Sequence, residues 1–178
     1  MNHEIQTILS AAQFAAEKHA DQKRKGGEPF INHLIEVAHL VSTAIPEPDA
    51  NLVAAAFLHD TIEDTGVTAA ELTERFGQDV TGLVLEVTDD KSLAPEVRKR
   101  LQIEHAPKLS VRAQTIKLAD KISNLRSILF SPPPDWGYER KKQYFEWGRR
   151  VADGLSAPNP ILKAEFEKTY QRFGEVRK

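Results

Sequence analysis

Apolar residues recur at intervals of three and four along nearly the whole chain, as Ile5, Ile8 and Leu9 do near its start. That spacing places side chains on one face of an α-helix, whereas a half-buried strand needs strict alternation, which we find nowhere in the sequence. We therefore expect an all-α fold, a bundle of about eight or nine helices. The expected helices cover residues 4–20, 31–44, 50–58, 69–76, 79–87, 95–105, 111–130, 138–155 and 160 onward.

Residue types that favour helix ends support these boundaries. Asp49, Ser110 and Asn159 precede expected helices, and each can accept a hydrogen bond from a free N–H of the first turn. Thr68 does the same and has an acid three positions later, the spacing of a capping box. The helix 31–44 is expected to end before Pro46 and Pro48, since proline lacks the N–H that an α-helix needs.

The length and the charge narrow the classes of protein. The 178 residues contain no internal repeat or linker, so we expect one domain spanning residues 1–178. Lys and Arg total 24 and Asp and Glu total 26, which gives a net charge of −2. Proteins that bind nucleic acids or anionic membranes usually carry a basic excess, so neither partner is expected.

The absence of cysteine excludes disulfides, iron–sulfur clusters and thiolate zinc sites. The longest apolar run, residues 52–58, is too short to span a membrane, and the N-terminal residues do not resemble a secretory signal. We therefore expect a soluble, cytoplasmic protein.

A histidine and an aspartate, His59 and Asp60, directly follow the most apolar of the expected helices. Alone, the pair could be a favourable helix C-terminus with a turn-forming aspartate. Three other features point to a site: His33 and Asp120 lie near apolar helix faces, and the acidic pair at 63 and 64 follows one turn later. Buried ionisable groups are costly unless they are paired, hydrogen-bonded or bound to a metal.

Two imidazoles and two carboxylates form a mixed nitrogen and oxygen ligand set, which suits Mn²⁺, Fe²⁺, Co²⁺ or Zn²⁺. The candidate ligands are His33, His59, Asp60 and Asp120. An open site of this kind can lower the pKa of water and so generate a nucleophile. An acid of the pair at 63 and 64 could then orient or deprotonate the attacking water.

These residues resemble the HD-domain metal-dependent phosphohydrolases, an all-helical family with the pattern H…HD…D. Three segments resemble the hydrolase domain of the RelA/SpoT alarmone enzymes more closely: residues 59–65, 87–91 and 117–126. Leu34 departs from the family, which often has proline directly after the first metal histidine. The similarity covers residues 5–173 and leaves no room for a synthetase, which indicates a small alarmone hydrolase.

The resemblance implies hydrolysis of the 3′-pyrophosphate of guanosine tetra- or pentaphosphate, giving GDP or GTP and pyrophosphate, with Mn²⁺ as the usual metal. It implies that Glu63 and Asp64 position and activate the attacking water. The implied contacts of the guanine nucleotide come from the loop before His33, from two helices and from a turn: Arg24, Lys25, Asn124, Tyr144 and Lys91.

Other interpretations stay open. An HD phosphohydrolase could act on another nucleotide with a 2′- or 3′-phosphate, and a non-catalytic alarmone-binding module could share the fold. A plain structural helical protein would leave the buried acids unexplained. The sequence does not indicate an oligomeric state.

Overall fold

The computed structural model describes residues 2–47 and 49–175, and the described part is built from α-helices without a strand. The predicted all-α class is confirmed. Nine α-helices and one short 3₁₀-helix, η1, occur in the described ranges: α1 (Asn2–Lys18), α2 (Ile31–Ala44), α3 (Ala50–Leu58), α4 (Thr61–Thr65), α5 (Ala69–Val87), α6 (Pro95–His105), η1 (Ala106–Lys108), α7 (Val111–Phe130), α8 (Tyr138–Gly154) and α9 (Pro160–Glu175).

The predicted helix caps are confirmed. Asp49 Oδ1 accepts from the N–H of the third residue of α3 at 2.9 Å, and Thr68 Oγ1 accepts from α5 at 3.2 Å. Ser110 Oγ and Asn159 Oδ1 do the same for α7 and α9. Helix α2 ends at Ala44, before the first proline, whereas Pro48 lies outside the described residues.

Two boundaries differ from the prediction in an instructive way. The two helices expected on either side of Gly77 form the single element α5, which bends where Gly77 has φ 83° and ψ 168°. That backbone conformation suits glycine and breaks the helix without ending it. Thr61–Thr65, which we had not assigned to a helix, forms α4 and ends at Gly66 with φ 75°.

The buried face of α1 is not the one that the periodicity indicated. Ile5 and Leu9 are 53% and 63% exposed, whereas Ala11, Phe14 and Ala15 are buried. Apolar residues occur on two adjacent stripes of this helix, and the packing partner decides between them. Helix α3 packs along α1, and the small residues 11 and 15 allow the two helices to approach closely.

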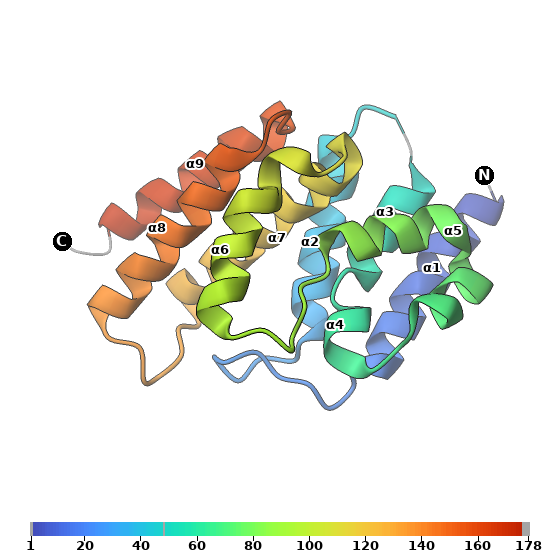
Figure 1. Cartoon of the computed structure of the whole chain (residues 1–178), viewed down its shortest axis with the longest axis horizontal. Coiled ribbons are helices and arrows are strands. Elements are labelled where there is room, and N and C mark those ends of the chain that lie inside the picture. The colour runs from blue at the N-terminus through green and yellow to red at the C-terminus, as the bar shows by residue number, and fades with distance from the viewer. Residues whose placement is uncertain (1, 48, 176–178) are drawn as a thin grey trace.

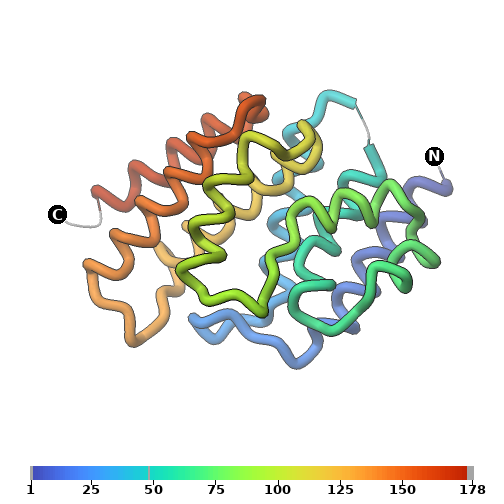
Figure 2. The backbone as a smooth tube through the Cα atoms, in the orientation of Figure 1, coloured from blue at the N-terminus to red at the C-terminus, as the bar shows by residue number. Residues whose placement is uncertain are grey.

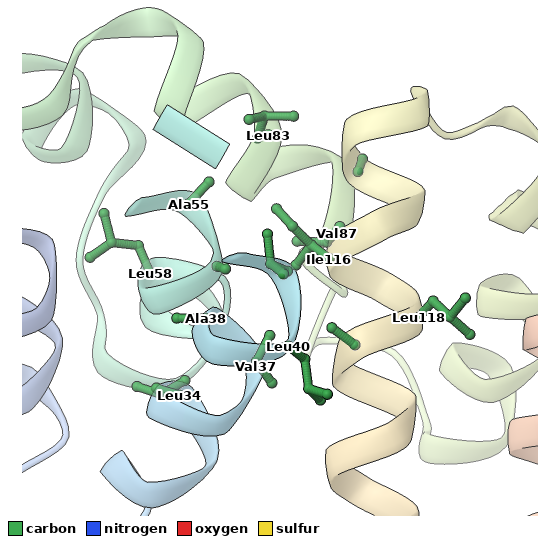
Figure 3. Packing of buried hydrophobic residues seen from close by; sticks show 14 of the residues in the cluster. Leu34, Val37, Ala38, Leu40, Ala55, Leu58, Leu83, Val87, Ile116 and Leu118 are labelled. Carbon is green, nitrogen blue, oxygen red and sulfur yellow. The ribbon is translucent and has the colours of Figure 1, made fainter. Parts of the chain in front are cut away.

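Helices α2 and α7 lie at the centre of the molecule (Figure 1). Helices α1, α3, α4 and α5 lie toward one end and α6, α8 and α9 toward the other, so the two termini lie at opposite ends. Side chains of α2, α3, α5 and α7 meet in the hydrophobic core between these four helices. They include Leu34, Val37, Leu58, Val87 and Ile116 (Figure 3). Within the described ranges, no helix is both long and apolar enough to cross a membrane.

Three loops run along one edge of the molecule (Figure 2): residues 19–30, 88–94 and 131–137. Helix α4 lies at the same edge (Figure 1). Loops can carry polar side chains at modest cost, and the helices beside them hold those side chains in place. The candidate site lies here.

Candidate active site

Three buried elements supply the polar cluster at the centre of the site. His33 lies in the first turn of α2, His59 and Asp60 link α3 to α4, and Asp120 lies in the middle of α7. His33 and His59 are each 3% exposed and Asp120 is 8% exposed. Helix α3 is apolar on nearly every side, and its residues 52–56 and 58 are buried, so its end places His59 and Asp60 in the interior.

The four side chains face one another. His33 Nε2 lies 3.3 Å from Asp120 Oδ1 and 3.5 Å from Asp60 Oδ2. His59 Nε2 lies 3.3 Å from the same Asp60 oxygen and 3.7 Å from the same Asp120 oxygen. Ions with bonds of about 2.0–2.2 Å to nitrogen and oxygen hold neighbouring ligand atoms about 3.0–3.5 Å apart. The cluster therefore has the dimensions of a metal site, and the donor atoms of His33, His59 and Asp60 lie within 4.8 Å of one another.

The hydrogen bonds of the two rings fix which nitrogen carries the proton. His59 Nδ1 lies 2.8 Å from the carbonyl oxygen of Ala56, which can only accept, so Nδ1 carries the hydrogen. Ser123 Oγ donates to Glu36 Oε2 at 2.6 Å, and it therefore accepts from His33 Nδ1 at 2.8 Å. In the neutral form that a metal ligand needs, each ring would direct the lone pair of Nε2 toward the carboxylates.

Two lone pairs and two carboxylates facing one another need a positive charge between them. His59 Nε2 is buried and makes no hydrogen bond. Burial lowers the pKa of His59, but the negative charges of Asp60 and Asp120 outweigh this effect and raise the pKa to about 10. The cluster thus attracts a cation, and a divalent ion with imidazole and carboxylate ligands satisfies all four groups.

Asp120 has further partners that hold its carboxylate in place. Asn124 Nδ2 donates to Asp120 Oδ1 at 2.6 Å, and Lys121 Nζ donates to Oδ2 at 2.9 Å. Burial lowers the pKa of Lys121, yet the adjacent Asp120 outweighs it and the pKa is raised. Lys121 therefore stays charged and helps to keep Asp120 ionised.

The acidic pair lies beside this cluster, on α4. Glu63 Oε2 accepts from the N–H of Asp89 at 3.0 Å, and Glu63 Oε1 lies 3.6 Å from Arg98 Nη1. Burial, with the negative charges of Asp60, Asp89 and Asp64, raises the pKa of Glu63 to about 7 although the Asp89 N–H opposes the shift. A carboxyl group with a pKa near 7 can exchange protons at neutral pH.

Asp64 has a different environment. Gln22 Nε2 donates to its Oδ2 at 2.6 Å, and the ammonium of Lys91 donates to its Oδ1. Both oxygens thus have partners from loops, one from each side. Lys91, one of the residues predicted to contact the nucleotide, thus lies against Asp64 in the structure.

Two connected cavities, of about 300 and 260 Å³, flank the cluster and share Lys25, Asp60, Glu63, Asn124 and Tyr144 as walls. Arg24 lines the larger one, and its Nη2 donates to Asn124 Oδ1 at 2.6 Å. Four of the five residues predicted to contact the nucleotide thus line the cavities beside the cluster.

Several residues that line the two cavities were not predicted from the sequence. Trp136 closes the larger cavity, with Lys25 Nζ 5.4 Å from its ring centre. Arg98, Lys99 and Lys117 line the smaller one. Arg98 and Lys99 lie outside the recognised motifs, and single cations in a charged helix such as α6 give no signal of their own. Lys117 begins the segment 117–126, but nothing in that segment singled it out as a wall residue.

A larger apolar groove of about 610 Å³ lies elsewhere, between α1, α2 and α3. Its walls include Ile5, Ile8 and Ile35 and none of the residues of the polar cluster. The size of a cavity therefore does not locate the chemistry in this molecule.

Comparison with known proteins agrees with the geometry. The family model of the HD domain matches residues 11–143. The MESH1 proteins of Xenopus tropicalis and Homo sapiens, both named guanosine-3′,5′-bis(diphosphate) 3′-pyrophosphohydrolase, are 45% and 43% identical to this chain over 98% of each chain. The GTP pyrophosphokinase rsh of Brucella ovis is 37% identical over 127 residues, 68% of this chain but 17% of that protein.

Solved structures show the same similarity. A structure described as a metazoan ortholog of SpoT that hydrolyses ppGpp has a TM-score of 0.89 and 43% identity, over 94% of this chain and 96% of that one. A protein of Listeria monocytogenes has a TM-score of 0.66 and 28% identity, over 80% of this chain and 99% of that one.

Proposed function

This chain belongs to the HD-domain family, and we propose from that premise that it hydrolyses the 3′-pyrophosphate of guanosine tetra- or pentaphosphate, as the names of its MESH1 relatives state for them. Water would supply the oxygen that bonds to the 3′-linked phosphorus. The bond from that phosphorus to the ribose 3′-oxygen would break, and the products would be GDP or GTP and pyrophosphate.

One observation carries the proposal: two imidazole Nε2 atoms and two carboxylates face one another, and beside them lies Glu63, whose pKa is raised to about 7. We assign His33, His59, Asp60 and Asp120 as ligands of one divalent ion, and Mn²⁺ as that ion. When bound, such an ion lowers the pKa of water and stabilises charge on a phosphoryl group. Mn²⁺ fits the mixed nitrogen and oxygen set, as Fe²⁺, Co²⁺ and Zn²⁺ also would.

Glu63 and Asp64 take separate roles in this proposal. Glu63 accepts the proton of the attacking water, because its pKa lies near the working pH. Asp64, held on both oxygens by Gln22 and Lys91, orients that water as a fixed hydrogen-bond acceptor. Lys91 supports Asp64 in this arrangement, and we keep it as a proposed contact of the substrate phosphates.

The nucleotide occupies the cavities on either side. Arg24 and Lys25 supply positive charge to a polyanionic substrate, which the overall charge of −2 does not. Asn124, bonded to both Arg24 and Asp120, couples nucleotide binding to the polar cluster. Tyr144 stands in the wall of both cavities, edge-on to Trp136 at 5.4 Å, and offers a ring face for packing.

We propose that the whole chain, residues 1–178, acts as one hydrolase unit. Helix α9 lies beyond the matched family model but packs on α7, which carries Asp120. We also propose a cytoplasmic location, which follows from the class of substrate.

The test measures GDP and pyrophosphate after incubating the purified protein with guanosine tetraphosphate, with and without Mn²⁺. A parallel reaction contains a nicotinamide dinucleotide with a 2′-phosphate, the alternative class of substrate. We expect turnover of the tetraphosphate only with the ion. Equal efficiency on the 2′-phosphate compound would contradict the alarmone assignment, and no turnover of either would contradict the hydrolase.

A further inference from the structure

His19 and Gln22 form a hydrogen-bonded chain that ends on Asp64. His19 Nδ1 lies 2.7 Å from Gln22 Oε1, and Gln22 Nε2 lies 2.6 Å from Asp64 Oδ2. His19 and Gln22 lie in the loop directly after α1, and Asp64 lies on α4. The sequence predicted no role for His19 or Gln22, and the proposed function uses Gln22 as a partner of Asp64 without assigning a part to His19.

The direction of this chain follows from its chemistry. An ionised carboxylate only accepts, so the amide NH₂ of Gln22 faces Asp64 and its carbonyl oxygen faces His19. His19 must then carry its hydrogen on Nδ1. Burial lowers the pKa of His19, so the ring is neutral and its other nitrogen, Nε2, bears a lone pair. Nε2 is buried without a hydrogen-bond partner, and an unpaired acceptor there agrees with a proton on Nδ1 because buried N–H groups rarely stay unpaired.

The chain is rigidly supported. His19 is 2% exposed, and its ring stacks on Phe30 with 5.1 Å between centres. The N–H of Gln22 donates to the carbonyl of His19 at 3.0 Å, and its own carbonyl accepts from the N–H of Phe30 at 2.9 Å. Gln22 thus has backbone and side chain both fixed, so it can hold a partner in one orientation.

We propose that Gln22 is a positioning residue that fixes the orientation of the Asp64 carboxylate, and that His19 fixes the orientation of the Gln22 amide. The inference rests on the proposed function, in which Asp64 orients the attacking water. Without Gln22, the Asp64 carboxylate keeps one side-chain partner among the described residues, Lys91, whose side chain is 49% exposed and holds a single oxygen. The carboxylate is then free to turn about its bond, and an error of about 1 Å in such a group can cost about 100-fold in rate.

The first experiment compares Gln22→Met, which keeps the length of the side chain, with Gln22→Glu, which keeps its shape but turns the donor into an acceptor. Gln13→Met is the matched control, since Gln13 lies on the exposed face of α1 and bonds only Glu17. We expect kcat for guanosine tetraphosphate to fall about tenfold or more in both Gln22 variants, with KM and bound Mn²⁺ unchanged. An unchanged kcat, or an equal loss of bound Mn²⁺, overturns the inference.

The second experiment tests His19 by rescue. His19→Leu removes the donor, whereas His19→Asn places an amide N–H near the position of Nδ1. Both variants lose the stacked ring, so a purely structural role predicts equal loss of kcat. We expect the asparagine variant to recover most of the kcat that the leucine variant loses; equal kcat in the two overturns the role of His19.

A nitrogen-15 spectrum of the histidine rings separates a failure of this inference from a failure of the proposed function. If the wild-type protein does not hydrolyse the tetraphosphate, the proposed function fails. The spectrum still tests the hydrogen bonds from His19 through Gln22 to Asp64. His19 should be protonated on Nδ1 and unprotonated on Nε2, and Gln22→Met should change this pattern. A proton on Nε2 and none on Nδ1 of His19 in the wild-type protein overturns the hydrogen bond from His19 to Gln22 and with it the inference.

Discussion

Arg24 of the loop after α1 donates a hydrogen bond from Nη2 to Asn124 Oδ1 at 2.6 Å, and the amide of Asn124 donates in turn to Asp120 at 2.6 Å. One asparagine thus connects the nucleotide cavity to the polar cluster. A guanidinium that is already oriented can grip phosphate with two donors, whereas a lysine offers a point charge.

Removing this arginine should weaken substrate binding more than chemistry. Arg24→Met should raise KM for guanosine tetraphosphate about tenfold or more, since a hydrogen bond to a charged group contributes about 1.5–3 kcal/mol. Arg24→Lys should recover only part of the loss. Lys163→Met, on the exposed side of α9, is the control. Steady-state kinetics decide the matter, and an unchanged KM in Arg24→Met would show that Arg24 does not contact the substrate.

The contact of Ser123 with His33 predicts an effect on metal affinity. Ser123→Ala leaves His33 Nδ1 without the oxygen that accepts its hydrogen, so the ring can turn or change tautomer. Loss of such an outer partner typically lowers metal affinity about 10–100-fold. Titration with Mn²⁺ should show this weakening, while Ser42→Ala, on the exposed part of α2, should bind as the wild type does. Equal affinities would mean that the contact with Ser123 does not orient His33 for metal binding.

The division between ligands and water-activating acids predicts two classes of variant. Glu63→Ala and Asp64→Ala should abolish turnover and largely keep the metal, because the carboxylates that face the two histidine Nε2 atoms are those of Asp60 and Asp120. His59→Ala and Asp60→Ala should lose it. Metal content measured after gel filtration distinguishes the classes, and an equal loss in all four would refute the division.

The raised pKa of Glu63 has a consequence for stability. Its pKa rises from 4.5 to about 7 on folding, so between these values the folded state holds more protons than the unfolded state. The contribution of Glu63 to stability therefore falls as pH rises from 4.5 to 7, by up to about 3 kcal/mol. Glu63→Gln should gain stability relative to the wild type above pH 7 and lose that advantage below pH 4.5. Urea unfolding of the metal-free proteins at pH 4 and 8 measures it; a constant difference would contradict the raised pKa.

Much of this molecule could be predicted because its determinants are local. Caps such as Ser110 act within one turn, and the apolar run before His59 brings that residue into the core whatever packs around it. The candidate ligands could be predicted to form one cluster, because buried ionisable residues need partners and few such residues occur on apolar helix faces in this sequence.

The remainder depends on contacts between distant segments. The prediction of which face of α1 is buried was wrong, because that face is determined by packing against α3 and not by the sequence of α1. Ser123 bonds His33 across 90 positions and Gln22 bonds Asp64 across 42, and neither serine nor glutamine is unusual where it stands. Such partners become visible only when the helices are placed.

The central claim is that water attacks the 3′-linked phosphorus, and isotopic oxygen tests it most directly. The Mn²⁺-loaded protein hydrolyses guanosine tetraphosphate in ¹⁸O water under single-turnover conditions, and mass spectrometry measures the ¹⁸O content of each product. The account predicts one ¹⁸O in pyrophosphate and none in GDP. Label in GDP, or release of labelled orthophosphate in place of pyrophosphate, would contradict it.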